Sequence, residues 1–260
     1  MIIIDNTFLF LISLALGLSL PLIGVFVILR KEALLSDALA HTLLLGIALS
    51  ITFKVNALVG IFAFTVLAGV AIFLVREKAN LGMDAVVGVF FTTSLAIGSL
   101  LISSEDLLEA FLGNLEKITK GDVIASIIMA AVIIGVLLVK FRGFAFSSFA
   151  PDLAKVDKLN TKKYELLFIL MLSLGVAMGI KLVGTLLISA LIIVPAATAK
   201  IFSMQIRSMA VWSMLFGLIS VFGGLVAASA LESPPGPAII LFGSSIFFLV
   251  FIFSSLLKQK

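Results

Sequence analysis

The sequence predicts an all-α, polytopic membrane protein with about nine transmembrane helices, each needing roughly 20 apolar residues. Hydrophobic residues make up 62% of the 260 residues and charged residues only 12%, whereas soluble domains are near half apolar and a quarter charged. The charged residues also lie in short clusters between long apolar runs. Because no polar stretch is long enough for a soluble domain, we expect a single membrane domain over residues 1–260.

Nine apolar runs have a length that can cross a bilayer. They cover residues 8–29, 35–53, 55–75, 84–102, 122–140, 164–183, 186–203, 208–231 and 238–257. Two joints are very short, since Lys54 alone separates the second run from the third and Gly184-Thr185 the sixth from the seventh. If one of these segments is re-entrant, eight spans remain.

The lysine and arginine residues predict the orientation of the chain. With the N-terminus outside, 14 of the 18 cations face the cytoplasm, as the positive-inside rule requires. The inner set comprises Arg30, Lys31, Arg76, Lys78, Lys140, Arg142, Lys155, Lys158, Lys162, Lys163, Lys200, Arg207, Lys258 and Lys260, and the outer set Lys54, Lys117, Lys120 and Lys181. An odd number of spans then places the C-terminus in the cytoplasm.

Two connections between the runs are long. The outer one, residues 103–121, carries Leu108, Phe111, Leu112 and Leu115 at helical spacing, which predicts a short amphipathic helix. Within the inner one, residues 140–163, we expect a helix to begin near Ser147-Ser148. Serine is common just before a helix, Pro151 would sit near the first turn, and the acidic residue Asp152 follows it.

Several classes of function are excluded by what the chain lacks. It has no cysteine and one histidine, so it has no disulfide or thiolate ligand, and most nucleophile–base and zinc-hydrolase sites cannot be assembled. It has no Gly-x-x-x-x-Gly-Lys-Ser/Thr motif and cannot cradle ATP phosphates by itself. The net charge of +4 fits the positive-inside bias and needs no nucleic-acid partner. We expect no permanently bound cofactor.

Asp37 and His41 are the strongest candidates for a site. They lie four residues apart, on one face of the second apolar run, just after Arg30-Lys31. Ionisable groups within spans are costly and usually functional, and imidazole with carboxylate suits zinc, manganese or iron(II). The structural alternative is that Asp37 caps the helix and His41 donates to a backbone carbonyl.

Several stretches, in order, resemble the membrane permease subunit of zinc/manganese-type ABC importers. They are residues 25–46, 111–114 followed by Asp122, 149–154, 183–200 and 235–241, and together they run through nearly the whole chain. Departures from the family pattern concern Ala150 before Pro151, Asp152 where Glu is usual, and Lys158 where Gly is usual. A further departure is Pro237 in the last stretch.

The resemblance implies a transmembrane permease domain with a smaller version of the fold of cobalamin and siderophore importers. It implies a homodimer in a prokaryotic plasma membrane, with a cytoplasmic ATP-binding subunit under each permease and an extracellular metal-binding protein. The importer would carry a divalent transition metal inward, either zinc or manganese, with iron as a further alternative. The chain itself would hydrolyse no ATP.

The resemblance also implies roles for particular residues. Asp37 and His41 would contact the metal, and the segment Pro151, Asp152, Leu153, Ala154 and Lys155 would dock on the ATPase. The span after Gly184 would line or gate the path through Gly184, Ser189, Pro195 and Thr198, although Pro195 can also merely kink a span.

Two other functions are alternatives to an importer permease. An ion-coupled secondary transporter would use Asp37 and His41 as a proton relay and would need no ATPase. An intramembrane enzyme would need paired catalytic carboxylates at matching depths.

Overall fold

The computed structural model describes residues 7–53, 56–79, 81–101 and 119–257, where all regular secondary structure is helical and no strand occurs. The helices are α2 (Thr7–Arg30), α3 (Ala33–Phe53), α4 (Ala57–Ala79), α5 (Met83–Leu101), α7 (Lys120–Val139), α8 (Phe141–Phe149), α9 (Pro151–Val156), α10 (Thr161–Val183), α11 (Thr185–Phe202), α12 (Ile206–Leu231) and α13 (Pro235–Leu257). The predicted all-α class is confirmed. The joint at Lys54 and the helix expected around 108–115 lie outside the described residues.

Each of the nine predicted apolar runs overlaps a helix. Within the described ranges, seven helices are long and apolar enough to cross a membrane, namely α2, α3, α4, α5, α7, α12 and α13. α10 opens with Lys162, Lys163 and Glu165, and α11 is only 18 residues long, with Lys200 in its last turn. The chain is therefore a membrane protein with seven candidate spans in these ranges.

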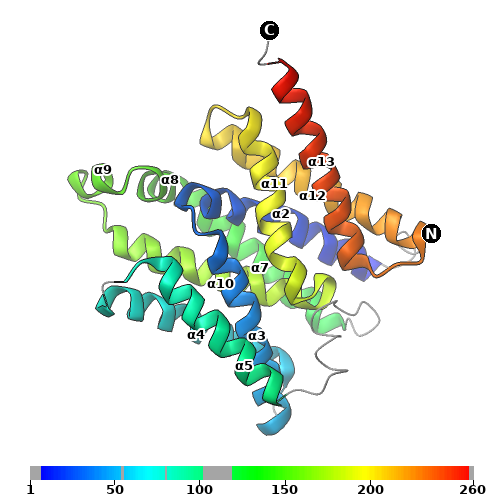
Figure 1. Cartoon of the computed structure of the whole chain (residues 1–260), viewed down its shortest axis with the longest axis horizontal. Coiled ribbons are helices and arrows are strands. Elements are labelled where there is room, and N and C mark those ends of the chain that lie inside the picture. Colours follow the sequence, from blue (N-terminus) through cyan, green and yellow to red (C-terminus); the bar gives the residue numbers. More distant parts are fainter. Residues whose placement is uncertain (1–6, 54–55, 80, 102–118, 258–260) are drawn as a thin grey trace.

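Helix α2 lies in the middle of the bundle and packs against α7, α10, α11 and α12 (Figure 1). Its side chains Leu16, Leu20, Ile23 and Phe26 are fully buried. Burying these side chains stabilises the packing of the neighbouring helices against α2.

Two glycines let other helices approach α2 closely. A Cβ on Gly24 would collide with the backbone carbonyl of Ile192 in α11, and one on Gly217 of α12 would collide with the Pro21 ring. At the same crossing, the Ser213 hydroxyl donates to the Pro21 carbonyl at 2.7 Å. Small residues at such crossings are typical of helix packing in membranes.

The inner connection contains two short helices, where the sequence predicts one. Ser147 and Ser148 form the last turn of α8 instead of preceding a helix start, and α9 begins at Pro151. The residue before a proline is disfavoured in the helical conformation. Ala150 accordingly has φ −140° and ψ 69°, which ends α8 and separates the two helices.

A single residue joins α10 to α11. Gly184 has φ 76°, a left-handed conformation that favours glycine, and it serves as the N-cap residue of α11. The short joint predicted at Gly184-Thr185 therefore separates two helices, with Thr185 as the first residue of the second.

Candidate functional site

The turn between α2 and α3 positions both candidate residues. Only Lys31 and Glu32 separate the two helices, and Lys31 has a left-handed φ of 59°. The Lys31 N–H donates to the Ile28 carbonyl at 3.3 Å and the Glu32 N–H to the Val27 carbonyl at 3.1 Å. This pair of bonds is a Schellman motif, which satisfies the last carbonyls of α2. The turn therefore has little freedom and fixes where α3 begins.

Asp37 lies inside α3, four residues after its first residue Ala33. It is thus too far along the helix to be its N-cap residue, and the capping alternative for Asp37 is not supported. The neighbouring Ser36 hydroxyl bonds within the same turn, donating to the Ala33 carbonyl at 2.7 Å. The Asp37 residue is half-buried.

His41 is buried, and its Nδ1 lies 2.9 Å from the backbone carbonyl oxygen of Asp37. A carbonyl can only accept, so Nδ1 carries the proton and the lone pair of the neutral ring is on Nε2. The ring packs against Phe91 of α5, with centroids 4.5 Å apart. The bond to a backbone carbonyl is therefore present, and such a bond also orients a metal-binding imidazole.

The two residues offer a metal ion an incomplete ligand set. Among the residues that the structure describes, no group of three or more His, Cys, Asp or Glu side chains could hold a metal. As a predicted site, Asp37 and His41 of one chain would offer only two ligands, a carboxylate and an imidazole, so an ion there would need water or groups from another chain. An open set of this kind suits an ion that must also leave.

The residues expected to line a path lie along α11. Gly184 caps the helix, Pro195 interrupts its hydrogen bonding, and the Thr198 hydroxyl donates to the Val194 carbonyl of its own helix at 2.8 Å. The Ser189 hydroxyl is buried without a hydrogen-bond partner in the described part of the chain. Thr185, one turn earlier, shares this property, and the sequence does not single it out as a path-lining residue.

The segment expected to dock on a partner forms α9, which packs against α8 and α10. Asp152 and Leu153 are exposed, whereas Ala154 is fully buried and so presents no surface to a partner. Phe149, Leu153 and Val156 expose 74%, 64% and 80% of their surface. These three residues, the α8–α9 apolar cluster, extend the predicted segment at both ends. Their signal in the sequence is an apolar residue every third or fourth position within a basic loop.

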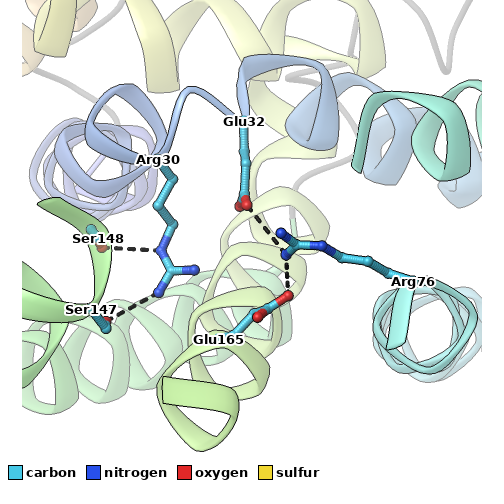
Figure 2. A network of polar contacts seen from close by, with 6 residues as sticks. All are labelled: Arg30, Glu32, Arg76, Ser147, Ser148 and Glu165. Atoms are coloured by element: carbon cyan, nitrogen blue, oxygen red, sulfur yellow. Dashed lines mark hydrogen bonds and ion pairs between the residues drawn. The ribbon is translucent and has the colours of Figure 1, made fainter. Parts of the chain in front are cut away.

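A polar network beside the α2–α3 turn is missing from the sequence predictions (Figure 2). Arg30, the last residue of α2, donates through Nε to the Ser148 hydroxyl at 3.0 Å and through Nη2 to the Ser147 hydroxyl at 3.2 Å. Its guanidinium carbon also lies 4.6 Å from the ring centroid of Phe168 in α10. Arg30 therefore ties α2 to both α8 and α10.

The second half of the network holds Glu32. The Arg76 guanidinium of α4 lies 3.5 Å from the Glu32 carboxylate and also bonds to Glu165 of α10. Burial raises the pKa of the Glu32 carboxyl, while the nearby Arg30 and Arg76 charges oppose this rise. A further ion pair, between Lys162 and Glu77, joins α10 to α4 at the surface. The α2–α3 turn is thus held from α4, α8 and α10.

Comparison with known proteins places this arrangement in context. A family model described as the ABC 3 transport family matches residues 5–254. The chain is 32% identical over 246 residues to the manganese transport system membrane protein MntC of Listeria monocytogenes, covering 93% of this chain and 88% of the relative. It is 29% identical over 244 residues to the high-affinity zinc uptake system membrane protein ZnuB of Haemophilus influenzae, covering 92% and 94%.

A solved structure has the same fold. PsaBC from Streptococcus pneumoniae in complex with Fab matches this chain with a TM-score of 0.85 at 28% identity. The match covers 96% of this chain and 92% of that chain.

Proposed function

The chain belongs to the ABC 3 transport family, and we propose that it is the membrane permease subunit of an ATP-driven importer for zinc or manganese. The observation that carries the proposal is likeness to manganese- and zinc-transport membrane proteins along nearly the full length of both partners. The metal is the cargo, and residues 1–260 form one permease domain in a prokaryotic plasma membrane.

A separate cytoplasmic subunit would hydrolyse the ATP, since the sequence has no phosphate-binding loop. The α8–α9 apolar cluster supports α9 as the docking element, because exposed apolar patches commonly mark interfaces between proteins. In this proposal Pro151, Asp152, Leu153 and Lys155 belong to the docking segment, while Ala154 anchors it to the protein interior.

Asp37 and His41 would contact the metal during transfer. The backbone bond that leaves the His41 lone pair on Nε2 supports this role. Two copies of the chain, with α5 near the dimer axis, would supply two such pairs. α5 and α13 are the least buried candidate spans, with 22% and 11% buried, and His41 lies directly against α5.

The topology of the chain and its translocation path complete the proposed importer. We place the N-terminus outside and the C-terminus in the cytoplasm, with α10 and α11 as the sixth and seventh of nine spans. An extracellular metal-binding protein would deliver the ion. Gly184, Ser189, Pro195 and Thr198 would then belong to a gate helix, and the buried, unpartnered hydroxyls of Thr185 and Ser189 support a polar lining along it.

The test is metal uptake in the native host, with chromosomal copies carrying His41→Ala, Asp37→Ala or the control Ser36→Ala. Ser36 lies on the same helix and bonds only within its own turn. We expect the first two variants to lose uptake of radiolabelled zinc or manganese at unchanged abundance, and the control to keep it. Normal uptake by both site variants would disprove the site assignment.

A second measurement separates the proposal from a secondary transporter. Right-side-out membrane vesicles are loaded with ATP or with a non-hydrolysable analogue before metal is added outside. Uptake that requires hydrolysable ATP supports the importer. Uptake that follows a proton gradient equally well with the analogue supports the ion-coupled alternative.

A further inference from the structure

The network in Figure 2 connects α8, the helix just before the docking segment, with the turn that leads into the helix carrying Asp37 and His41. We propose that Arg30 is a positioning residue that transmits movement of α8–α9 to α3 and so couples metal transfer to ATP hydrolysis. This inference rests on the proposed function, because it takes α9 as the ATPase contact and α3 as the metal-bearing helix.

The first step leads from the docking segment to Arg30. α9 packs against α8, and only Ala150 separates the two helices. Ser147 and Ser148 lie in the last turn of α8, directly before the exposed Phe149, and both are buried. A displacement of α8 by a docked partner therefore carries both acceptors of the Arg30 guanidinium with it.

The geometry of Arg30 suits this transmission. Its guanidinium uses two nitrogens toward two neighbouring hydroxyls and stacks over Phe168, so it is held from two sides. A planar, forked donor loses little freedom when it makes such paired bonds. A lysine ammonium reproduces the charge but neither the fork nor the stacking.

The second step leads from Arg30 to the candidate site. Two residues join Arg30 to α3, and the Schellman bonds of Lys31 and Glu32 restrict the backbone motion of that turn. His41 lies nine residues beyond Glu32, about 13 Å along a continuous helix at 1.5 Å per residue. A tilt of the turn is thus passed along a rigid element to Asp37 and His41.

A fixed support lies on the other side of the turn. Arg76 binds both Glu32 and Glu165, which connects the turn to α4 and α10. When α8 moves, Arg30 follows the serines while Glu32 stays with Arg76. The Arg30 end of the turn then moves while the Glu32 end stays in place, and this difference rotates α3 about the turn.

The experiment uses the complete importer, purified from the native host through a tag on this chain and reconstituted in lipid vesicles. ATP hydrolysis and zinc or manganese uptake are measured on the same sample for Arg30→Gln, Arg30→Lys and a Ser147→Ala/Ser148→Ala double variant. The matched control is Arg142→Gln, because Arg142 lies exposed on α8 and its guanidinium stacks only on Phe146 of the same helix, 5.7 Å from the ring centroid.

We expect Arg30→Gln to keep its ATPase subunit and its basal hydrolysis while the ATP consumed per ion imported rises about tenfold, a usual size for coupling between sites. Arg30→Lys should fall in between. The serine variant should also raise the ATP consumed per ion. Adding Arg30→Gln to the serine variant should cause little further change, since both variants remove the same interaction. Arg142→Gln should match the wild type.

Two results would overturn the inference. One is an Arg30→Gln variant whose hydrolysis and uptake fall together at a constant ratio, which is the behaviour of a residue that only stabilises the fold. The other is an unchanged ratio in the serine variant, which also decides the matter if Arg30→Gln cannot be purified. If the wild-type importer itself shows no ATP-dependent uptake, the proposed function fails instead.

Discussion

The Nδ1 atom of His41 lies 2.9 Å from the backbone carbonyl oxygen of Asp37, one helical turn earlier. The two candidate ligands are thus linked through the helix backbone. In the proposed site, the groups that would contact a metal ion are the Asp37 carboxylate and His41 Nε2.

The bond to the backbone predicts how His41 variants behave. In His41→Asn, the side-chain amide can still donate to the Asp37 carbonyl, but the Nε2 ligand is lost. We expect normal abundance and thermal stability with metal uptake reduced at least about tenfold, as for lost metal-site groups. Phe91→Leu, which changes the ring packed on His41 and leaves both ligands, is the control. Full uptake by His41→Asn would assign His41 a structural role.

The α8–α9 apolar cluster predicts where the ATPase subunit binds. Phe149→Ser and Leu153→Asp remove exposed apolar surface and should release the ATPase subunit during affinity purification, without lowering the amount of the chain in the membrane. The control is Leu231→Ser at the end of α12, which is 75% exposed and on the opposite side of the membrane in our orientation. Retention of the ATPase by both cluster variants would contradict docking at α9.

Two glycines in open surroundings predict where a second copy packs. A Cβ on Gly88 of α5 or on Gly135 of α7 meets nothing within 4 Å in one chain. If α5 lies at the dimer contact, Gly88→Leu should shift the purified protein from dimer to monomer, as judged by light scattering in detergent. Gly135→Leu should remain dimeric. The reverse pattern would place the contact on α7.

The close approach of α11 to α2 predicts a stability difference between two equal substitutions. Gly24→Ala forces the backbones apart and should lower the free energy of unfolding by about 1–3 kcal/mol, as overpacking does. Gly135→Ala, with open space around it, should gain about 0.5–1 kcal/mol from helix propensity. Thermal unfolding in detergent measures both, and equal melting temperatures would refute the close crossing.

Burial of Glu32 predicts a pH dependence of stability. Because its folded-state pKa is raised, the folded protein binds this proton more tightly than the unfolded chain does. The associated stability is complete below the unfolded pKa and is lost as pH rises through the raised one. Glu32→Gln should therefore become more stable relative to the wild type as pH increases across that window, as measured by melting temperatures. A melting-temperature difference between Glu32→Gln and the wild type that stays constant across this window would contradict the raised pKa of Glu32.

The sequence predicts the helices well and the contacts between them poorly. All nine apolar runs overlap helices because length and hydropathy are local properties, and the family resemblance is confirmed by the match over residues 5–254. Within the described residues, seven helices qualify as membrane spans by length and composition, so the predicted number of nine is not confirmed. The other two are α10, which opens with charged residues, and α11, which has only 18 residues.

The parts that sequence reasoning missed depend on tertiary structure. Arg30, Arg76, Ser148 and Glu165 are far apart in the chain and come together only through the packing of α2, α4, α8 and α10. The break at Ala150 was a local effect of Pro151 and could have been anticipated. The burial of Ala154 could not, since a six-residue helix shows its buried side only once it is packed.

The single-residue joint at Gly184 has a mechanical consequence for α10 and α11. With one residue between them, the last Cα of α10 and the first Cα of α11 can never be more than about 7.6 Å apart, or two Cα–Cα steps. The two helices cannot slide past each other, so any relative motion is a rotation about this point. Gly184 therefore acts as a hinge: the angle between α10 and α11 can change while their adjoining ends stay together.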